Sequence, residues 1–222
     1  MSTFVLIPGA GGAAWYWHRV VPMLTAAGHT AIAVDLPGAS PTVGLREYEA
    51  FVAAAAAGEE RVVLVAQSMG AFTALGCCER LPVERLVLLN AMIPAPGETP
   101  GQWWSNTDWP ETEDLADVDR LFLHDVPPEV AAAGAAHQRP EADIAFGQPC
   151  GFSRWPDIPT AVLAGRDDRL FPFDFQARVA RDRLGLDVVA LPGGHLTALS
   201  QPEAVTAAIL APTRASTSWS AP

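Results

Sequence analysis

Short apolar runs alternate with longer segments of helical periodicity along most of this chain. The apolar runs are too short for helices and suit buried strands; they lie at residues 4–7, 30–34, 62–66, 85–89, 160–164 and 187–191. Helical patterns lie at residues 17–27, 45–57, 69–80, 172–184 and 203–210. Strands that alternate with helices pair in parallel and are covered on both faces. We therefore expect an α/β protein with a doubly wound, mostly parallel sheet of about six strands.

The alternation stops after the fourth apolar run. Residues 91–158 are rich in proline, tryptophan and acidic residues, with short helical patterns at 113–123 and 128–136. A segment of this length is not an ordinary loop of a compact domain, so we predict a helical cap inserted above the sheet. The α/β core then comprises residues 1–90 and 159–211, and we expect the polar tail, residues 212–222, to be disordered.

The composition argues against several classes of function. The formal net charge is −11 and there is no basic cluster, so neither a nucleic-acid partner nor an anionic membrane surface is expected. All fourteen basic residues are arginine, which excludes lysine-based Schiff-base or P-loop chemistry. The three cysteines, Cys77, Cys78 and Cys150, have neither metal-ligand nor disulfide spacing. No cofactor and no metal are predicted.

Free thiols are typical of a reducing compartment. The first residues, MSTFVLIPGA, lack the charged and apolar regions of a signal peptide, and no apolar stretch is long enough to span a bilayer. We therefore expect a cytoplasmic protein without membrane association. Its partner would be a small-molecule substrate, and a homodimer is compatible with these features.

Polar side chains follow the predicted strands at their carboxyl ends, where doubly wound sheets bind ligands. Ser68 follows the third strand, Asp167 and Asp168 the fifth, and His195 the sixth. Ser68 alone has two interpretations: it caps the next helix, or it lies in a tight turn that exposes a nucleophile. Histidine and carboxylate at the same edge favour the nucleophile, because serine needs a base to take its proton. The chain order serine, aspartate, histidine is that of α/β-hydrolases.

Over residues 4–210 the chain resembles the α/β-hydrolase fold family. The turn reads AQSMG, so Ala66 replaces the first glycine of the family's G-x-S-x-G, and alanine is still small enough where strand and helix approach closely. The resemblance implies an oxyanion hole formed by the backbone N–H groups of Ala10 and Met69. In the first loop, PG replaces the family's usual HG, but backbone donors survive such side-chain changes.

The resemblance also implies which aspartate belongs to the triad. The family's acid usually lies three residues after the glycine that ends its strand, here Gly165, which indicates Asp168 rather than Asp167. Ser68 is then the nucleophile and His195 the base that later protonates the leaving group. Asp168 fixes the imidazole tautomer and stabilises the imidazolium.

Two stretches, FVLIPGAGGAAWYWHRVVPMLTAAGH and the cap segment FLHDVPPEV, are similar to the small-cap esterase and hydroxynitrile lyase branch of this family. Aromatic side chains of a small cap often line an apolar pocket, although here they fit equally well as anchors of the cap. Our candidate substrate contacts are Trp15, Trp104, Phe122 and Leu170.

The sequence therefore predicts a carboxylesterase-like serine hydrolase that cleaves a small apolar or aromatic ester through an acyl-enzyme. One alternative is a hydroxynitrile lyase-like enzyme on the same scaffold, although this chain lacks the lysine that plant lyases of the branch typically use. The other alternative is a ligand-binding homologue without catalysis.

Overall fold

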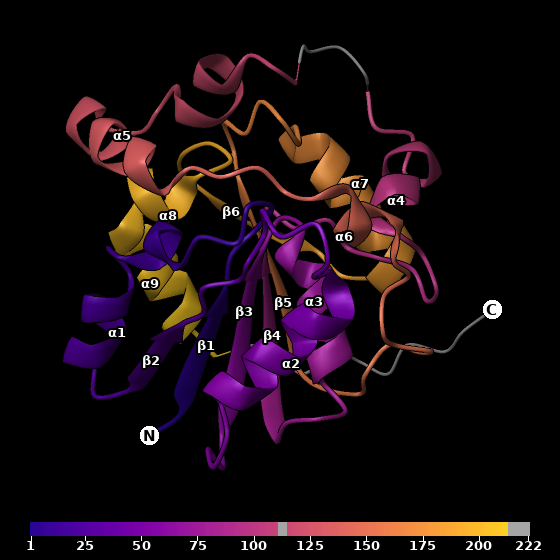
Figure 1. Cartoon of the computed structure of the whole chain (residues 1–222). Coiled ribbons are helices and arrows are strands. Elements are labelled where there is room, and N and C mark those ends of the chain that lie inside the picture. The colour runs from indigo at the N-terminus through magenta and orange to yellow at the C-terminus, as the bar shows by residue number, and fades with distance from the viewer. Residues whose placement is uncertain (111–114, 213–222) are drawn as a thin grey trace.

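The protein is built around a six-stranded β-sheet in which every neighbouring pair is parallel (Figure 1). The computed structural model describes residues 1–110 and 115–212. The strands are β1 (Thr3–Ile7), β2 (Thr30–Ala33), β3 (Val62–Gln67), β4 (Val83–Leu89), β5 (Thr160–Gly165) and β6 (Val188–Leu191). The expected fold class is confirmed, and the sheet is wholly parallel.

The strand order β2-β1-β3-β4-β5-β6 reverses direction between β1 and β3. The chain leaves β1 towards β2 on one side, then returns past β1 and continues to β6 on the other. Such a reversal separates the loops that follow the two central strands and opens a crevice at their carboxyl ends. The loops after β1 and β3 therefore flank the place where a doubly wound sheet binds its ligand.

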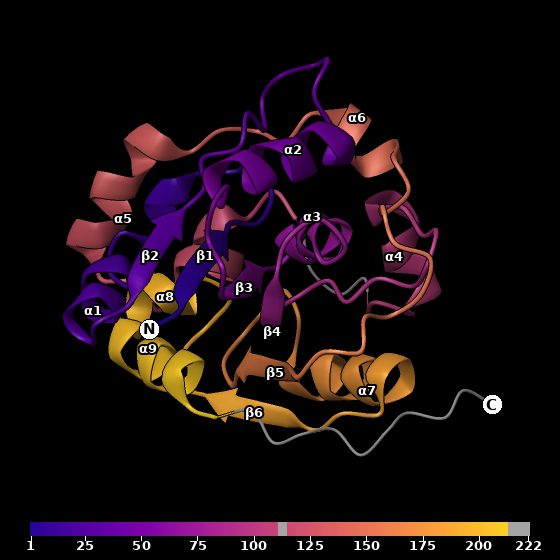
Figure 2. The ribbon, with the colours of Figure 1, turned by 90° about the horizontal axis from the view of Figure 1, so that it is seen from below.

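Helices cover both faces of the sheet, as Figure 2 shows along the strands. Val5 and Ile7 of β1 belong to the apolar core on one face, whereas Phe4 and Leu6 belong to the core on the other. This division follows from the alternation of side chains along a strand. The first face packs against α2 (Leu45–Ala55), α3 (Gly70–Cys77) and α7 (Phe173–Leu184), and the second against α1 (Val21–Ala26) and α9 (Pro202–Leu210).

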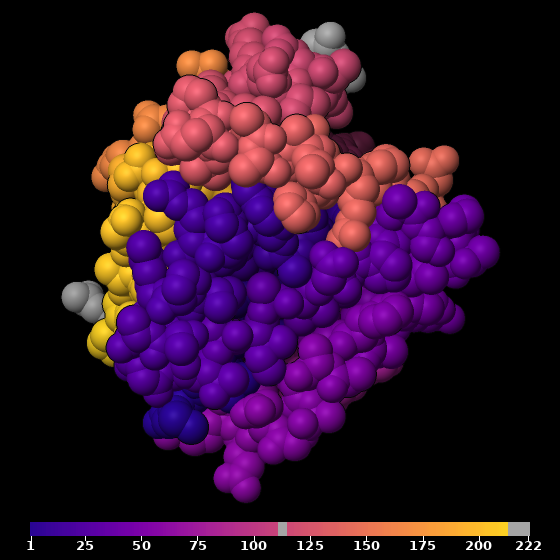
Figure 3. All heavy atoms as spheres, turned by 60° about the vertical axis from the view of Figure 1, so that its left-hand side comes forward, coloured from indigo at the N-terminus to yellow at the C-terminus, as the bar shows by residue number. Residues whose placement is uncertain are grey.

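Between β4 and β5 the described residues form helices and loops. The helical elements are α4 (Pro100–Asn106), the π-helical η2 (Asp119–Leu123), α5 (Pro128–Gly134), the 3₁₀ turn η3 (Ala135–His137) and α6 (Asp143–Gly147). They lie beyond the carboxyl ends of the strands, at the top of Figure 1. In Figure 3 the later part of this segment, in salmon, lies across the indigo N-terminal part of the chain.

Several helices differ from their predicted extents. The expected helix 17–27 is divided into a 3₁₀ turn, η1 (Ala14–Trp17), and α1, because Pro22 lacks an amide N–H and favours the first turn of a helix. Within the expected helix 113–123 only η2 is helical among the described residues, and residues 113–114 lie outside them. Of the tail expected at 212–222, residues 213–222 also lie outside the described part.

Candidate active site

Ser68 occupies the tight turn between β3 and α3. Its backbone has φ of 51°, in the left-handed region that residues other than glycine seldom adopt. The turn is held by hydrogen bonds from the Ser68 amide to the Leu89 carbonyl (3.2 Å) and from the Met92 amide to the Ser68 carbonyl (3.0 Å). A side chain at Gly70 would come within 2.4 Å of the Pro8 carbonyl oxygen, so this turn needs a glycine there. The strained turn presents the serine hydroxyl at the carboxyl end of the sheet.

His195 lies in the loop after β6 and connects two side chains from other loops. Its Nε2 atom is 3.1 Å from Ser68 Oγ, and its Nδ1 atom is 2.9 Å from Asp168 Oδ2. The imidazole is buried, with the rings of Phe122 and Phe171 edge-on to it at centroid distances of 5.3 and 5.0 Å. The structure thus brings together the serine, histidine and aspartate that the sequence singled out.

The Asp168 carboxylate is fixed by four hydrogen bonds. Oδ1 accepts from the backbone amides of Leu170 (2.9 Å) and Phe171 (2.8 Å). Oδ2 accepts from Gln176 Nε2 at 3.2 Å in addition to its contact with His195. Hydrogen bonds to an ionised acceptor are strong, so they set the carboxylate in one orientation towards the imidazole. Asp168 is 4% exposed.

Asp167 is exposed to solvent and points elsewhere. Its Oδ2 accepts from the Gly193 amide at 3.4 Å, and it has no contact with the imidazole. The two neighbouring aspartates therefore have different surroundings: Asp168 faces the His195 imidazole, and Asp167 faces the solvent.

The loop after β1 lies directly against Ser68. A side chain at Gly9 would come within 2.9 Å of Ser68 Cβ, so only glycine permits this approach. Ala10 lies in this loop, and Met69 is the residue directly after the serine. Within residues 1–110 and 115–212, neither of their amides has a hydrogen-bond partner.

A cavity of about 530 Å³ opens above Ser68 and His195. Two of the predicted substrate contacts, Trp15 and Phe122, line it. Apolar side chains dominate its wall, among them Tyr16, Val118, Leu123, Ala131, Leu196 and Leu199. The cavity is formed jointly by the loops of the sheet and by residues of the 91–158 segment.

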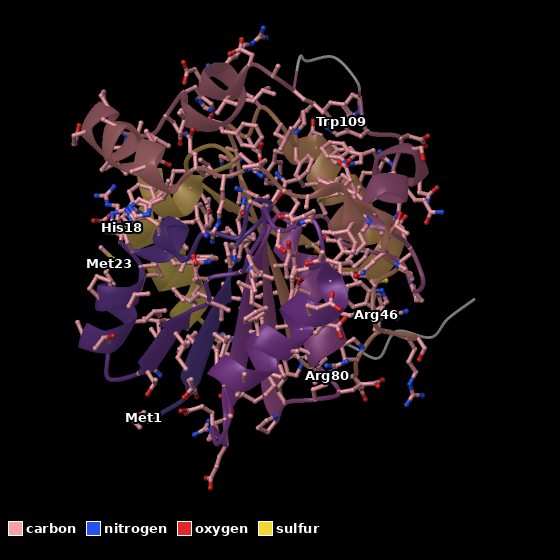
Figure 4. All side chains as sticks on the ribbon, viewed as in Figure 1. Met1, His18, Met23, Arg46, Arg80 and Trp109 are labelled. Carbon is pink, nitrogen blue, oxygen red and sulfur yellow. The ribbon has the colours of Figure 1, made fainter. Side chains whose placement is uncertain are left out.

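The other two predicted contacts, Trp104 and Leu170, do not line this cavity. Trp104 packs against the rings of Trp103, Trp109 and Phe171 at centroid distances of 5.6, 4.9 and 5.7 Å. Trp109, labelled at the cap end of the molecule in Figure 4, donates its indole N–H to the Leu170 carbonyl at 2.8 Å. These aromatic residues anchor α4 and its neighbours to the core, which is the second of the two roles that the sequence allowed.

Gln67 contacts the His195 imidazole and was not singled out from the sequence. Its Nε2 atom lies 3.1 Å from His195 Nε2 and 3.5 Å from the His195 carbonyl oxygen. A neutral imidazole whose Nδ1–H is donated to Asp168 has one acceptor position at Nε2. The Ser68 hydroxyl and the Gln67 amide therefore share the same nitrogen. Gln67 lies directly before the serine, at the end of a buried strand. This position in the sequence could have identified it as a residue of the site.

Asn90, directly after β4, ties the histidine loop to the sheet. It is fully buried and has a left-handed backbone with φ of 45°. Its Nδ2 donates to the carbonyls of Gly194 (3.0 Å) and His195 (2.9 Å), and its Oδ1 accepts from the Gly165 amide at 2.7 Å. One side chain therefore joins the ends of β4 and β5 to the segment that carries the imidazole.

Replacing Asn90 by alanine is expected to lower the free energy of unfolding by about 2–4 kcal/mol, because it removes three buried hydrogen bonds. Urea unfolding would measure this loss. Alanine at this position also strains the left-handed backbone. Asn90→Gly separates this strain from the loss of the hydrogen bonds, because glycine removes the same bonds but accommodates the left-handed backbone. A glycine variant as stable as the wild type would show that the three hydrogen bonds contribute nothing.

The fold and this site define the class of protein. The profile of the Alpha/beta hydrolase family matches residues 4–208, and the chain belongs to this family. Among the described residues, no helix is both long and apolar enough to cross a bilayer. In the same part of the chain, His, Cys, Asp and Glu side chains do not gather in threes or more around a potential metal position.

Similar proteins within the family include several esterases. The probable esterase PIR7A of rice (Oryza sativa subsp. indica) is 43% identical over 111 residues, which cover 44% of this chain and 42% of the rice protein. The chain thus matches less than half the length of this relative. Salicylic acid-binding protein 2 of tobacco (Nicotiana tabacum) is 24% identical over an alignment that covers 93% of this chain and 95% of that protein.

Solved structures resemble the whole chain. A pyrethroid hydrolase from Sphingobium faniae has a TM-score of 0.77 and 26% identity, over 94% of this chain and 95% of that one. Polyneuridine aldehyde esterase has a TM-score of 0.77 at 21% identity, over 95% of this chain and 98% of that one, and shares the fold.

Proposed function

We propose that this protein is a serine hydrolase that cleaves small apolar or aromatic esters through an acyl-enzyme. The observation that carries the proposal is the continuous contact from Ser68 Oγ to His195 Nε2 (3.1 Å) and from His195 Nδ1 to Asp168 Oδ2 (2.9 Å), beside a cavity. The esterase names of the rice relatives and of polyneuridine aldehyde esterase support the same reaction class.

The proposed reaction begins when His195 takes the hydroxyl proton and Ser68 Oγ attacks the ester carbonyl carbon. The carbonyl electrons move to its oxygen, which the Ala10 and Met69 amides stabilise as an oxyanion hole. His195 then gives its proton to the oxygen of the alcohol group. The bond between this oxygen and the carbonyl carbon breaks, the alcohol departs, and the acyl group remains on Ser68. A water molecule, deprotonated by His195, releases the acid in the second half of the reaction. Asp168 stabilises the imidazolium in both halves. The turn at Ser68 is accordingly a nucleophile elbow.

The surroundings favour serine over cysteine as the nucleophile. Cys77 and Cys78 lie in or at the end of α3, outside the cavity lining, and burial raises the pKa of both thiols, that of Cys78 to about 12. Burial also raises the pKa of Cys150. Thiols with raised pKa values are protonated at neutral pH and are therefore poor nucleophiles.

Most of the cavity wall is apolar and supports an uncharged substrate, while His137 and Arg139 contribute polar groups to one part of it. Trp15 and Phe122 offer aromatic surface, and Leu123, Leu196 and Leu199 offer aliphatic surface. A cavity of about 530 Å³ suits a small ester rather than a polymer. Residues 91–158 act as the cap over this cavity, and residues 1–90 and 159–211 form the core.

Three finer expectations accompany the proposal. The reaction as written uses no cofactor. The free thiols of all three cysteines agree with a cytoplasmic location. A homodimer stays a prediction.

The direct test combines a fluorophosphonate probe with a pre-steady-state assay. We expect the probe to label Ser68, located by peptide mass spectrometry, and p-nitrophenyl acetate to give a burst of nitrophenolate equal to the enzyme concentration. Unlabelled Ser68 would support a ligand-binding homologue instead. Cleavage of mandelonitrile, with no burst from the ester, would support a lyase.

A further inference from the structure

Two residues of the 91–158 segment, Arg139 and Glu141, bind the loop after β1. Arg139 Nε donates to the Gly11 carbonyl at 2.5 Å, and its Nη2 donates to the Gly12 carbonyl at 2.7 Å. The same Nη2 is 2.7 Å from Asp35 Oδ1, which also accepts from the Ala14 amide at 2.9 Å. One guanidinium thus binds two successive carbonyls of this loop and a carboxylate beside it.

Glu141 binds a backbone N–H of the same loop. Its Oε2 accepts from the Gly11 N–H at 2.7 Å, and its Oε1 accepts from the Tyr48 hydroxyl at 2.5 Å. Tyr48 belongs to α2 and is 1% exposed, so the carboxylate is anchored to the core. Gly11 therefore has both its N–H and its C=O bound by the cap segment.

The loop packs closely against this segment at Gly11. Gly11 has φ of +83°, and a side chain there would come within 2.4 Å of the Arg139 carbonyl oxygen. The next contact along the segment, from the Ala142 amide to the Gly38 carbonyl at 2.8 Å, continues the same seam. In Figure 3 this seam is where the salmon surface meets the indigo one.

Ala10 lies inside the clamped loop. The peptide that carries the Ala10 N–H also carries the Gly9 carbonyl, and that carbonyl accepts from the Gly12 amide at 3.1 Å. Rotation of this peptide would change the direction of the Ala10 N–H and break the bond to Gly12. The Gly12 carbonyl is bound by Arg139 and also by the Leu36 amide at 2.8 Å, so the cap segment and the core together hold the turn that carries the Ala10 N–H.

We infer that Arg139 and Glu141 are positioning residues that orient the Ala10 amide, so that the cap completes the oxyanion hole of the hydrolase. The inference rests on the proposed function. Neither side chain has a polar contact with Ser68 or His195: the polar contacts of Arg139 are with the loop and Asp35, and those of Glu141 are with Gly11 and Tyr48. Arg139 also lines the cavity, whereas Glu141 does not, so Glu141→Ala is the cleaner variant for KM. Preorganised donors stabilise the transition state because they need no reorientation during the reaction. A loosened loop therefore lowers kcat more than it weakens substrate binding.

The test is steady-state hydrolysis of p-nitrophenyl acetate by Glu141→Ala and Arg139→Ala. We expect kcat to fall about 10- to 100-fold, a part of the loss typical for removing a whole oxyanion donor, and KM to change less than about threefold. A trifluoromethyl ketone, which Ser68 converts into a tetrahedral oxyanion, should bind more weakly by the same factor as kcat/KM falls. Inhibition by acetate, the planar product, should not change.

Conservative variants and matched controls separate positioning from stability. Glu141→Gln should retain most of the activity, because the glutamine oxygen can accept from Gly11 and the glutamine NH₂ group can donate to Tyr48. Burial raises the pKa of the Glu141 carboxyl group, which agrees with a neutral side chain being tolerated there. Tyr48→Phe should cost about twofold to fivefold in kcat, since one anchor of the carboxylate is lost. The exposed Arg154→Ala and Glu129→Ala should behave as the wild type.

Two failures can be told apart. Wild type that neither hydrolyses the ester nor binds the ketone contradicts the proposed function itself. An active wild type whose Glu141→Ala and Arg139→Ala variants keep kcat and ketone affinity, and lose only thermal stability, contradicts the inference. If either alanine variant does not fold, Tyr48→Phe and Arg139→Lys decide in its place. A lysine cannot reproduce the forked contact, so unchanged kcat in both would overturn the inference.

Discussion

Ser68→Ala is expected to abolish ester hydrolysis, with a fall in kcat of at least about 10⁵-fold, while the protein stays folded. The alanine side chain has no oxygen to attack the carbonyl, and the acyl-enzyme route is lost completely. The hydroxyl has one side-chain partner, His195 Nε2, so its removal should cost about 1 kcal/mol of stability. The thermal midpoint should then fall by no more than about 4 °C.

The measurement compares hydrolysis of p-nitrophenyl acetate with circular dichroism on the same preparations. Ser105→Ala is the matched control, because Ser105 is an exposed serine of α4 whose hydroxyl donates only to the Gln102 carbonyl. We expect the control to keep full activity. An alanine variant at position 68 that remains as active as the wild type would remove Ser68 from the reaction, whatever its distance from His195.

The sheet could be predicted because its central strands β1 and β3 are fully buried and almost wholly apolar, while the edge strands β2 and β6, although only partly buried, still consist mostly of apolar residues. All six runs correspond to observed strands, with ends that differ by one or two residues. The strands β1 and β3 are longer than predicted because their ladders extend to the polar residues Thr3 and Gln67, whereas the edge strands β2 and β6 are each one residue shorter than predicted. The helices α4, α6 and α8 (Thr197–Ser200) were not predicted, because fewer than two full turns carry a weak periodic pattern. The equally short α1 and α5 were found because they lie within longer stretches of helical pattern, at residues 17–27 and 128–136. Thr99 and Gln102 form a capping box that would have indicated the start of α4.

The three residues proposed for catalysis were accessible to sequence reasoning because a parallel sheet brings the carboxyl ends of its strands to one edge. Gln67, Asn90 and Glu141 were not, because their roles depend on which distant atoms their side chains reach. The contact between Glu141 and Gly11 joins residues 130 positions apart. Trp104 and Leu170 illustrate the opposite error: an aromatic or apolar residue near a cap is suited to a pocket wall and to an anchor alike, and only packing distinguishes the two.

Asp168→Asn should lower kcat about 10⁴-fold, whereas Asp167→Asn should change it less than about twofold. Two backbone amides donate to Asp168 Oδ1, so an asparagine must keep its oxygen there and place its NH₂ group at the position of Oδ2. That NH₂ group would face His195 Nδ1, which then has to accept. The imidazole proton moves to Nε2, and the base can no longer take a proton from Ser68.

The neighbouring aspartate is a close control, since the two positions receive the same substitution in the same loop. Asp167 is exposed and accepts a single long bond from the Gly193 amide, which an asparagine oxygen also accepts. Hydrolysis of p-nitrophenyl acetate at saturating substrate, with KM measured in parallel, provides the comparison. We expect similar KM values for the two variants, so that the difference in activity lies in kcat. The thermal midpoint of Asp168→Asn should be the lower of the two, because its NH₂ group replaces an oxygen that accepts from Gln176. Equal losses, or a larger loss at position 167, would mean that the buried carboxylate does not control the tautomer of His195 and that the acid of the site has been misassigned.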